Sequence, residues 1–250
     1  MNFTILRFDS LDSTNSEAVN QAKRGANEGL CIVAKQQTAG RGRHGRTWIS
    51  PENAGLYFSI VLRPKIETRF LPLLTLMSAV VVSDVLSELY NLKPDIKWAN
   101  DVHIDEKKIC GILAEAVETT KGLAIIVGIG INLKSPNFPV ELNKTTASIE
   151  AETNEMPDLE NLLENLTTKF AGFYKILNSE NGAEKIRLEW TRRSSYAFGK
   201  EVRAVLNNET IFGKTRGIEE NGALRIEQTN GVLKVIQAGD VEMIRKIPNE

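Results

Sequence analysis

The chain has 250 residues, with 31 Lys and Arg against 32 Asp and Glu, so its formal net charge is −1. Apolar residues make up 42% and charged residues 25%, the balance of an ordinary globular protein with one large domain or a large and a small one. The near-neutral charge argues against a chain-wide nucleic-acid or membrane-binding surface. The N-terminus has no basic segment followed by a long apolar run, so we predict no signal peptide and a cytoplasmic location.

The cysteines and the longest apolar stretch indicate a packed core. Cys31 and Cys110 each lie in an apolar run, which favours core packing in a reducing compartment over a disulfide or a catalytic thiol. The apolar stretch at residues 77–85 is interrupted by Ser78 and Ser83 and is far shorter than a membrane-spanning helix. We therefore predict no membrane association.

The first segments alternate between strand and helix patterns. Residues 3–8 predict a short strand, and residues 17–23 contain helix-forming side chains. Ser13, Thr14 and Asn15 precede this helix, and each has a side-chain oxygen able to cap it by accepting a backbone N–H bond. A polar helix N-terminus also suits the carbonyl or anionic group of a ligand. From these residues alone, capping is the favoured interpretation.

Residues 37–51, which we call the arginine loop, lie between strands predicted at residues 30–34 and 56–62. Glycines and arginines alternate in it, with no acidic residue: Gly40, Arg41, Gly42, Arg43, Gly45 and Arg46. Glycine lets the backbone approach a ligand closely, and the planar guanidinium group matches phosphate or carboxylate oxygens. The loop therefore predicts an anion-binding site, with a solvated basic loop as the alternative.

The loop also matches the G-x-G-x-x-G fingerprint of dinucleotide-binding folds, but its surroundings argue against that function. The fingerprint requires a helix to begin at its glycines, so that the helix N-terminus binds the pyrophosphate. Here Trp48 and Pro51 follow, and then a strand. The chain also lacks the later motifs of protein kinases and a Walker lysine motif. Neither of its two histidines has partners at a helical metal-ligand spacing, so we predict no zinc site.

After the loop, the sequence predicts a long core helix and three adjacent strands. Leu, Met and Val recur at helical spacing within residues 71–90. Residues 95–104 and 109–117 predict a hairpin with its turn at Asp105 and Glu106, and residues 123–131 predict the third strand. Such strands would carry five polar side chains toward one region: Lys97, Asn100, Asp101, Lys108 and Asn132.

The rest of the chain predicts a connection, two helices and a small β-barrel. Residues 135–157 show little periodicity, whereas residues 159–177 and 184–193 are amphipathic helices. Short strands are predicted at residues 202–206, 210–214, 223–227 and 232–236, separated by Asn-Asn or Asn-Gly turns at residues 207–208, 221–222 and 230–231. We predict a catalytic domain of residues 1–196 and an SH3-like barrel of residues 197–250.

Five motifs, in this order, closely resemble biotin–protein ligases. They are Asp12-Ser-Thr-Asn15, Gln37-Thr-Ala-Gly-Arg-Gly-Arg-His-Gly-Arg-Thr-Trp48, Lys97-Trp-Ala-Asn-Asp101, Lys108-Ile-Cys-Gly-Ile-Leu113 and Gly128-Ile-Gly-Ile-Asn132. Single motifs are weak, but five in order across the first 135 residues are specific, and the small barrel agrees. The resemblance is to the short class without a helix-turn-helix DNA-binding domain, because the catalytic domain already begins at Phe3.

The resemblance implies an α+β fold in which helices flank a mixed β-sheet, as in class II aminoacyl-tRNA synthetases and biotin ligases. It also implies a two-step reaction with ATP, biotin and Mg²⁺. Biotin's carboxylate attacks the α-phosphate of ATP, giving biotinyl-5′-AMP and pyrophosphate. A lysine of a biotin carboxyl carrier domain, such as that of acetyl-CoA carboxylase, then attacks the mixed anhydride and releases AMP. The implied partner is this carrier domain and not DNA, and the edge strands are compatible with a homodimer.

Carried over onto matching positions, the resemblance implies the site residues. Arg43 and Lys108 offset the repulsion between carboxylate and triphosphate, and Asp101 assists the incoming lysine or, with Asn100, holds Mg²⁺ or orients Lys97. Ser13, Thr14 and Asn15 bind the ureido end of biotin, and Asn132 contacts the adenine. The other implied contacts to biotin or the adenylate are Gln37, Gly40, Arg41, Gly42, Arg46, Trp48, Lys97, Gly111 and Gly130.

Two other functions stay open from the sequence. A lipoate or octanoate ligase of the same broad fold has less use for the polar group at Ser13, Thr14 and Asn15, because its ligand lacks the ureido ring. An RNA-binding module would use the arginine loop and the barrel, and its affinity would fall steeply with salt. The near-zero net charge counts against RNA binding.

Overall fold

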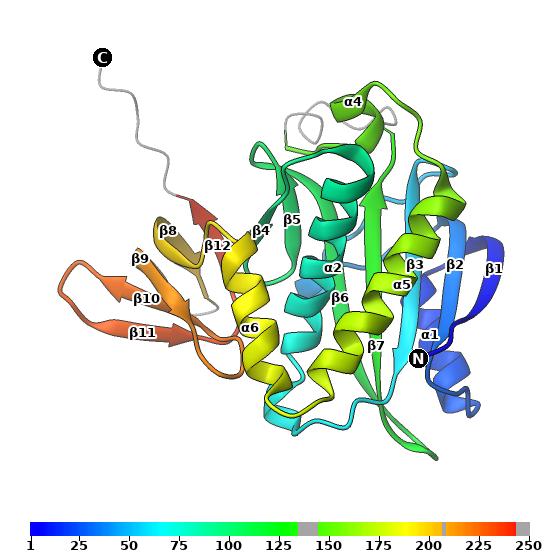
Figure 1. The fold of residues 1–250 in the computed structure, drawn as a ribbon, viewed down its shortest axis with the longest axis horizontal. Helices are drawn as coiled ribbons and strands as arrows, with labels where there is room; N and C mark the ends of the chain where they lie inside the picture. The colour runs from blue at the N-terminus through cyan, green and yellow to red at the C-terminus, as the bar shows by residue number, and fades with distance from the viewer. Residues whose placement is uncertain (135–144, 207–208, 244–250) are drawn as a thin grey trace.

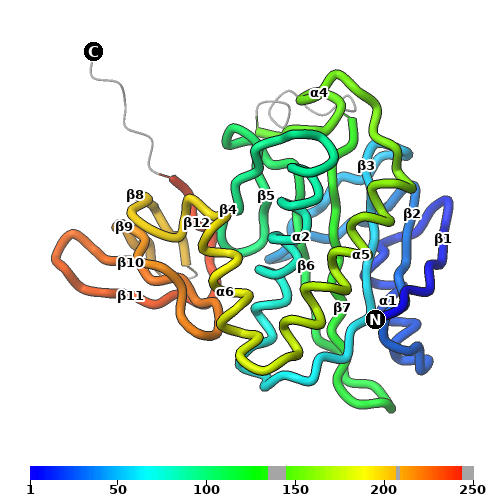
Figure 2. Tube along the Cα trace, viewed as in Figure 1, coloured from blue at the N-terminus to red at the C-terminus, as the bar shows by residue number. Residues whose placement is uncertain are grey.

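The computed structural model describes residues 1–134, 145–206 and 209–243, and these residues form two β-sheets. The larger sheet has seven strands in the order β1-β2-β3-β7-β6-β5-β4, and the smaller has five in the order β11-β10-β9-β8-β12. Strand β1 pairs with β2 in parallel, whereas the other neighbours in the larger sheet are antiparallel. The predicted α+β fold with a mixed sheet is confirmed. The smaller sheet lies beside the larger one, next to β4 and α6 (Figures 1 and 2).

The elements around the larger sheet follow the predicted order. They are β1 (Thr4–Leu11), α1 (Thr14–Lys23), β2 (Leu30–Gln37), β3 (Gly55–Leu62), α2 (Leu73–Tyr90), β4 (Asp95–Lys97), β5 (Asp101–Ile104), β6 (Lys107–Thr119), β7 (Gly122–Asn132), α4 (Ile149–Thr153), α5 (Leu159–Leu177) and α6 (Gly182–Arg193). Short 3₁₀ turns, Arg43–Gly45 and Thr68–Phe70, lie in the arginine loop and before α2. The smaller sheet contains β8 (Phe198–Val205), β9 (Thr210–Ile218), β10 (Leu224–Gln228), β11 (Leu233–Ile236) and β12 (Asp240–Met243).

Both faces of the larger sheet are covered, which follows from the side chains of its central strands. In β2, Cys31 and Val33 belong to the core under α2, α5 and α6, whereas Leu30 and Ile32 pack with Ala18 of α1. Successive side chains of a strand point to opposite faces, so an uninterrupted apolar run requires helices on both sides. The three long helices cross one face of the sheet, and α1 lies against the other (Figure 1).

Helix α2 is a core helix in spite of its membrane-like composition. The segment Thr68–Tyr90 has the length and hydropathy of a membrane span, and 67% of its most apolar window is buried inside the protein. It packs against the sheet, α5 and α6, so its apolar surface is buried within the protein. Both cysteines are buried and unbonded, as predicted, and burial raises the pKa of the Cys31 thiol to about 12.

The prediction of one continuous strand at residues 95–104 is wrong, because this segment folds back on itself. Strands β4 and β5 form an antiparallel pair in which Lys97 lies opposite Asp101, with the intervening residues as a tight turn. Trp98 stabilises the turn, since its indole is buried and its Nε1–H donates to the Gly222 carbonyl at 2.9 Å. The predicted turn at Asp105 and Glu106 is confirmed, and both residues have positive φ.

The second half also contains elements that the sequence did not reveal. Helix α4 lies within the predicted connection of residues 135–157, of which residues 135–144 are outside the described residues. Strand β12 pairs with β8 and adds a fifth strand where four were predicted. The predicted turn at residues 207–208 also lies outside the described residues.

Candidate active site

Strand β7 positions the site through the alternation of its side chains. Ala124 and Ile126 pack against α1, and the next residues on the same face are Gly128, Gly130 and Asn132. Apolar packing therefore gives way to two positions without a side chain. A Cβ atom at Gly128 would overlap Asn15 Oδ1, so this glycine lets the start of α1 approach the sheet.

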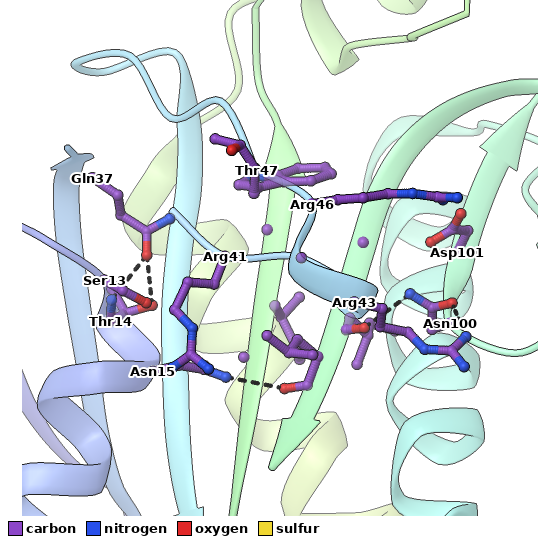
Figure 3. Close-up of a pocket in the computed structure, with 18 of the residues that line it drawn as sticks. Ser13, Thr14, Asn15, Gln37, Arg41, Arg43, Arg46, Thr47, Asn100 and Asp101 are labelled. Atoms are coloured by element: carbon purple, nitrogen blue, oxygen red, sulfur yellow. Dashed lines mark hydrogen bonds between the residues drawn. The ribbon is translucent and has the colours of Figure 1, made fainter. Parts of the chain in front are cut away.

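The first cavity lies over these glycines, between the start of α1 and the arginine loop, and has a volume of about 140 Å³. Fourteen of the predicted site residues line it: Ser13, Thr14, Asn15, Gln37, Arg41, Gly42, Arg43, Arg46, Trp48, Asn100, Asp101, Lys108, Gly111 and Gly130. Lys97 and Asn132 line a neighbouring cavity. Figure 3 shows Gln37, Ser13 and Thr14 on one side of the first cavity, and Arg43, Asn100 and Asp101 on the other.

One end of the first cavity is a buried polar network. The Gln37 side-chain oxygen accepts from the Thr14 backbone N–H at 2.8 Å and from the Thr14 hydroxyl at 3.1 Å. The Gln37 amide nitrogen donates to the Ser50 hydroxyl at 2.7 Å. The Ser59 hydroxyl lies 2.7 Å from Thr14 Oγ1 and 2.6 Å from Asn15 Oδ1, and its single hydrogen serves one of them at a time. These contacts fix the donors and acceptors before any ligand binds.

The capping interpretation of Ser13, Thr14 and Asn15 is wrong for their side chains. Ser13 occupies the N-cap position of α1, but its side chain makes no capping hydrogen bond. The Thr14 backbone N–H is instead satisfied by Gln37, from a different part of the chain. All three residues are at most 4% exposed and line the cavity. The helix start is therefore stabilised from outside, which leaves these polar side chains directed at the site.

Glu115 links this network to the arginine loop. One carboxylate oxygen accepts from Asn15 Nδ2 at 2.8 Å, and the other pairs with Arg41 Nη2 at 2.5 Å. Glu115 lies on β6, on the face that also carries Gly111, since β6 pairs with β7 as Gly111 with Gly130 and Glu115 with Ile126. Arg41 therefore closes the cavity through a carboxylate that the sequence analysis did not select.

At the opposite end of the first cavity, the two predicted catalytic cations have polar partners on the β4–β5–β6 hairpins. Arg43 Nη1 donates to Asn100 Oδ1 at 2.8 Å, and Asn100 Nδ2 donates to the Ile112 carbonyl at 3.1 Å. Lys108 Nζ lies 2.7 Å from Asp101 Oδ1 and 5.2 Å from the centre of the Trp48 ring. Asn100 and Asp101 thus orient the two predicted catalytic cations in this structure.

Three of the predicted contact glycines serve the arginine loop itself. A Cβ atom at Gly111 would lie 2.9 Å from Trp48 Cζ3, and one at Gly130 would lie 2.5 Å from Trp48 Nε1. The indole can rest on the sheet only because both positions lack a side chain. Gly40 is a buried residue of the loop, and a Cβ atom there would meet Ser50 Oγ at 2.7 Å. The Trp48 Nε1–H is buried, and the described residues offer it no hydrogen-bond partner.

A second cavity of about 540 Å³ adjoins the first, and Trp48, Asp101 and Lys108 line both. Lys97, Asn132, His103 and Tyr196 also line it. Asn132 Nδ2 donates to the carbonyls of Ala147 at 3.0 Å and Lys108 at 3.3 Å, so its amide is fixed beside the cavity. Burial lowers the pKa of His103 to about 4, against the attraction of Asp101, so this imidazole is neutral at physiological pH.

The smaller sheet contributes Asp240 to the first cavity. The Asp240 carboxylate forms an ion pair with Arg46, and its second contact, from Arg46 Nη1 to Asp240 Oδ1, measures 3.3 Å. Nothing in the sequence indicated this contact, because the two residues are 194 positions apart. Ser59 could have been selected from the sequence, because it is a polar residue inside an apolar strand.

Comparison with known proteins identifies the fold. The model of the biotin/lipoate A/B protein ligase family matches residues 7–132, and that of the biotin protein ligase C-terminal domain matches residues 197–243. This chain belongs to the biotin/lipoate A/B protein ligase family. The two matches together confirm the resemblance found in the sequence motifs.

Relatives of this biotin/lipoate ligase align over nearly all of it. It is 37% identical over 244 residues to the bifunctional ligase/repressor BirA of Bacillus subtilis, covering 96% of this chain and 74% of the relative. It is 34% identical over 237 residues to the biotin–[acetyl-CoA-carboxylase] ligase of Paracoccus denitrificans, covering 92% and 96%. The solved biotin protein ligase of Aquifex aeolicus in complex with biotin and ATP superposes with a TM-score of 0.83 at 30% identity, covering 97% and 99%.

Proposed function

We propose that this protein is an ATP-dependent biotin–protein ligase that makes biotinyl-5′-AMP and transfers biotin to a lysine of a biotin carboxyl carrier domain. The observation that carries the proposal is one continuous site with a neutral polar end, a cationic centre and an adjoining second cavity. These parts match the ureido ring, the reacting carboxylate and phosphate, and the nucleoside of the adenylate. The names of the Paracoccus and Aquifex relatives support the same activity.

In the first step, the polar network positions biotin. Ser13, Thr14 and Asn15 offer hydroxyl and amide groups to the ureido ring, and Gln37 and Ser59 hold Thr14 and Asn15 in place. A ureido ring has both N–H donors and a carbonyl acceptor, so it suits a site lined by groups of both kinds. This match favours biotin over lipoate, whose ring offers no such groups.

The valerate carboxylate then extends toward Arg43 and Lys108, where it meets the α-phosphate of ATP. A cation at about 4 Å contributes roughly 4 kcal/mol at an effective dielectric near 20, before desolvation costs. A carboxylate oxygen attacks the phosphorus atom, and pyrophosphate leaves. Because Asp101 holds Lys108 beside the reacting centre, little reorganisation of this lysine is required as charge develops. We assign Arg43 and Lys108 as catalytic residues, with Asn100 as the positioning partner of Arg43 and Asp101 as that of Lys108.

The second cavity is the proposed adenosine site. Asn132 lies at the end of β7 with its amide nitrogen already bonded to two carbonyls, which leaves its oxygen for the adenine amino group. Lys97 lies on the same rim and is available for the nucleotide phosphate or ribose. Trp48 separates this cavity from the first, so it lies where the acyl phosphate joins biotin to AMP.

Mg²⁺ would enter with the ATP phosphates and neutralise part of their charge. Within residues 1–134, 145–206 and 209–243, no three His, Cys, Asp or Glu side chains are grouped to hold a metal ion. Asn100 Oδ1 and Asp101 Oδ1 are occupied by Arg43 and Lys108, so Asp101 Oδ2 would be the protein ligand. One carboxylate together with phosphates and water is a donor set that suits Mg²⁺.

Several wider predictions accompany the proposal. The barrel is proposed to begin at residue 197, and the second family match, which starts there, supports this boundary. A cytoplasmic location and a homodimer remain predictions. Cell fractionation tests the location, and analytical ultracentrifugation tests the dimer.

Biotin-dependent exchange of pyrophosphate into ATP tests the first step, and the mass of a carrier domain incubated with ATP, Mg²⁺ and biotin tests the second. We expect exchange with biotin and none with lipoate, followed by the mass gain of one biotin. Exchange with lipoate alone would show a lipoate ligase. Salt-sensitive RNA binding without any adenylate would show an RNA-binding module.

A further inference from the structure

A third cavity of about 400 Å³ lies on the other side of Arg43 from the first. Arg43, Asn100, Ile112 and Leu113 line both cavities. The hydrogen bond from Arg43 Nη1 to Asn100 Oδ1, at 2.8 Å, therefore forms part of the wall between them. If the Arg43 guanidinium turns toward an acyl phosphate in the first cavity, this wall opens at the reacting centre.

The other walls of the third cavity come from distant parts of the chain. Thr75 and Leu76 belong to α2, Trp98 and Ala99 to the turn between β4 and β5, and residues 221–223 to the turn between β9 and β10 of the smaller sheet. Trp98 holds two of these walls together through its hydrogen bond to the Gly222 carbonyl. The third cavity thus lies at the junction of the two sheets and ends at Arg43, beside the reacting centre of the first cavity.

The charges around the third cavity argue against a pyrophosphate ligand. Arg43 and Arg69 are the charged residues that line it. Arg69 is already compensated, because it pairs with Glu67 at 2.9 Å and lies 3.6 Å from Glu220, with its guanidinium over the Phe70 ring. A trianionic ligand would meet one guanidinium, that of Arg43, which no carboxylate among the described residues neutralises, and Arg43 belongs equally to the first cavity. The remaining lining is apolar or neutral, which suits a long aliphatic stem that ends in an amine.

We propose that the third cavity admits the acceptor lysine of the carrier domain to biotinyl-5′-AMP. The assignment rests on the proposed ligase function, which requires a third reactant at the centre that the first two cavities share. Burial beside Arg43 disfavours an ammonium group, so the lysine reaches the acyl carbon as the neutral, nucleophilic amine.

The transfer requires no reactant other than biotinyl-5′-AMP and the lysine. The lysine nitrogen forms a bond to the acyl carbon, the bond from that carbon to the phosphate oxygen breaks, and AMP leaves with the electron pair. The ammonium group releases two protons to solvent, one before attack and one after the new C–N bond has formed. The turn at residues 221–223 gives the smaller sheet a defined part in this step, as one wall of the entrance.

Filling the third cavity tests the assignment, with Thr75→Trp as the variant and Thr75→Val as the matched control. Two rates separate the steps: biotin-dependent pyrophosphate exchange, and single-turnover transfer from enzyme-bound biotinyl-AMP to a carrier domain. We expect Thr75→Trp to keep exchange close to wild type and to slow transfer by about tenfold or more, since blocked approach of a reacting group is costly. Thr75→Val should change neither rate. Gln237→Trp, at an exposed position on the same cavity, should repeat the pattern if Thr75→Trp fails to fold.

Unchanged transfer in both folded tryptophan variants would overturn the assignment. Lost exchange together with normal transfer from supplied biotinyl-AMP would also overturn it, because the cavity would then pass pyrophosphate. Absence of biotin-dependent exchange in the wild-type protein would instead refute the proposed function itself, so the two failures are distinguishable.

Discussion

The two ends of the first cavity hold their polar groups in different ways. At the α1 end, Thr14 and Asn15 are each 4% exposed and bonded to Gln37, Ser59 or Glu115. At the arginine end, Arg43 is bonded to the neutral Asn100 amide, and Lys108 is paired with Asp101 beside the Trp48 ring. A buried hydrogen-bonded network is rigid, whereas a partly exposed arginine bonded to a neutral amide reorients at little cost. The α1 end is thus built to recognise a neutral ring, and the arginine end to change with the charge of each intermediate.

The largest expected effect is at the arginine end. Lys108→Ala should lower biotin-dependent pyrophosphate exchange by about 100-fold or more, as removal of one charge-stabilising group does in other enzymes. The side chain is 30% exposed and at the edge of the cavity, so the melting temperature should stay near wild type. Lys107→Ala, at the exposed neighbouring position, is the control. Near-normal exchange in Lys108→Ala would remove Lys108 from the mechanism.

The rigidity of the α1 end is tested by Gly128→Ala. The new methyl group must displace Asn15, so the KM for biotin should rise by about tenfold and the protein should lose roughly 1–3 kcal/mol of unfolding free energy. The KM for ATP should change less. Gly172→Ala is the matched control, because no atom outside its own helix lies within 4 Å of the new Cβ, and it should stabilise by about 0.5–1 kcal/mol. Equal rises in the KM values for biotin and for ATP would contradict the view that the α1 end recognises biotin independently of the arginine end.

Arg43→Gly tests whether the arginine end retains the intermediate. The variant should still form biotinyl-AMP, since Lys108 remains, but should release it about tenfold faster because the loop loses its bond to Asn100. Release is measured by trapping free biotinyl-AMP on a filter or with excess carrier domain. Asn100→Asp keeps an acceptor for Arg43 and should retain the intermediate. Wild-type retention in Arg43→Gly would show that this arginine does not hold the intermediate.

The smallest effect is expected at the ion pair of Arg46 with Asp240. Both side chains are partly exposed, so Asp240→Asn should cost about 0.2–1 kcal/mol and shorten retention of the intermediate about twofold. A double-mutant cycle with Arg46→Gln isolates the pair. Additive effects of the two substitutions would mean that the ion pair does not hold the loop.

The sequence predicted the local features of this protein better than its long-range ones. Helices α2 and α5 were located within two residues, because their apolar spacing is set by the helix itself. Fourteen of the predicted site residues line one cavity, because they belong to motifs typical of the family. The turn before Asp101 escaped prediction, because Trp98 stabilises it through Gly222, over one hundred residues away. Glu115 and Asp240 were missed for the same reason, as their partners are far apart in sequence.

The ion pair of Arg46 with Asp240 also bears on how the protein is made. It joins positions 194 residues apart, and the second belongs to β12. During synthesis, the seven strands of the larger sheet leave the ribosome long before β12 does. A nascent chain can therefore fold the pocket for the neutral ring while Arg46 still lacks its carboxylate partner. The complete arginine end forms only after β12 has been synthesised.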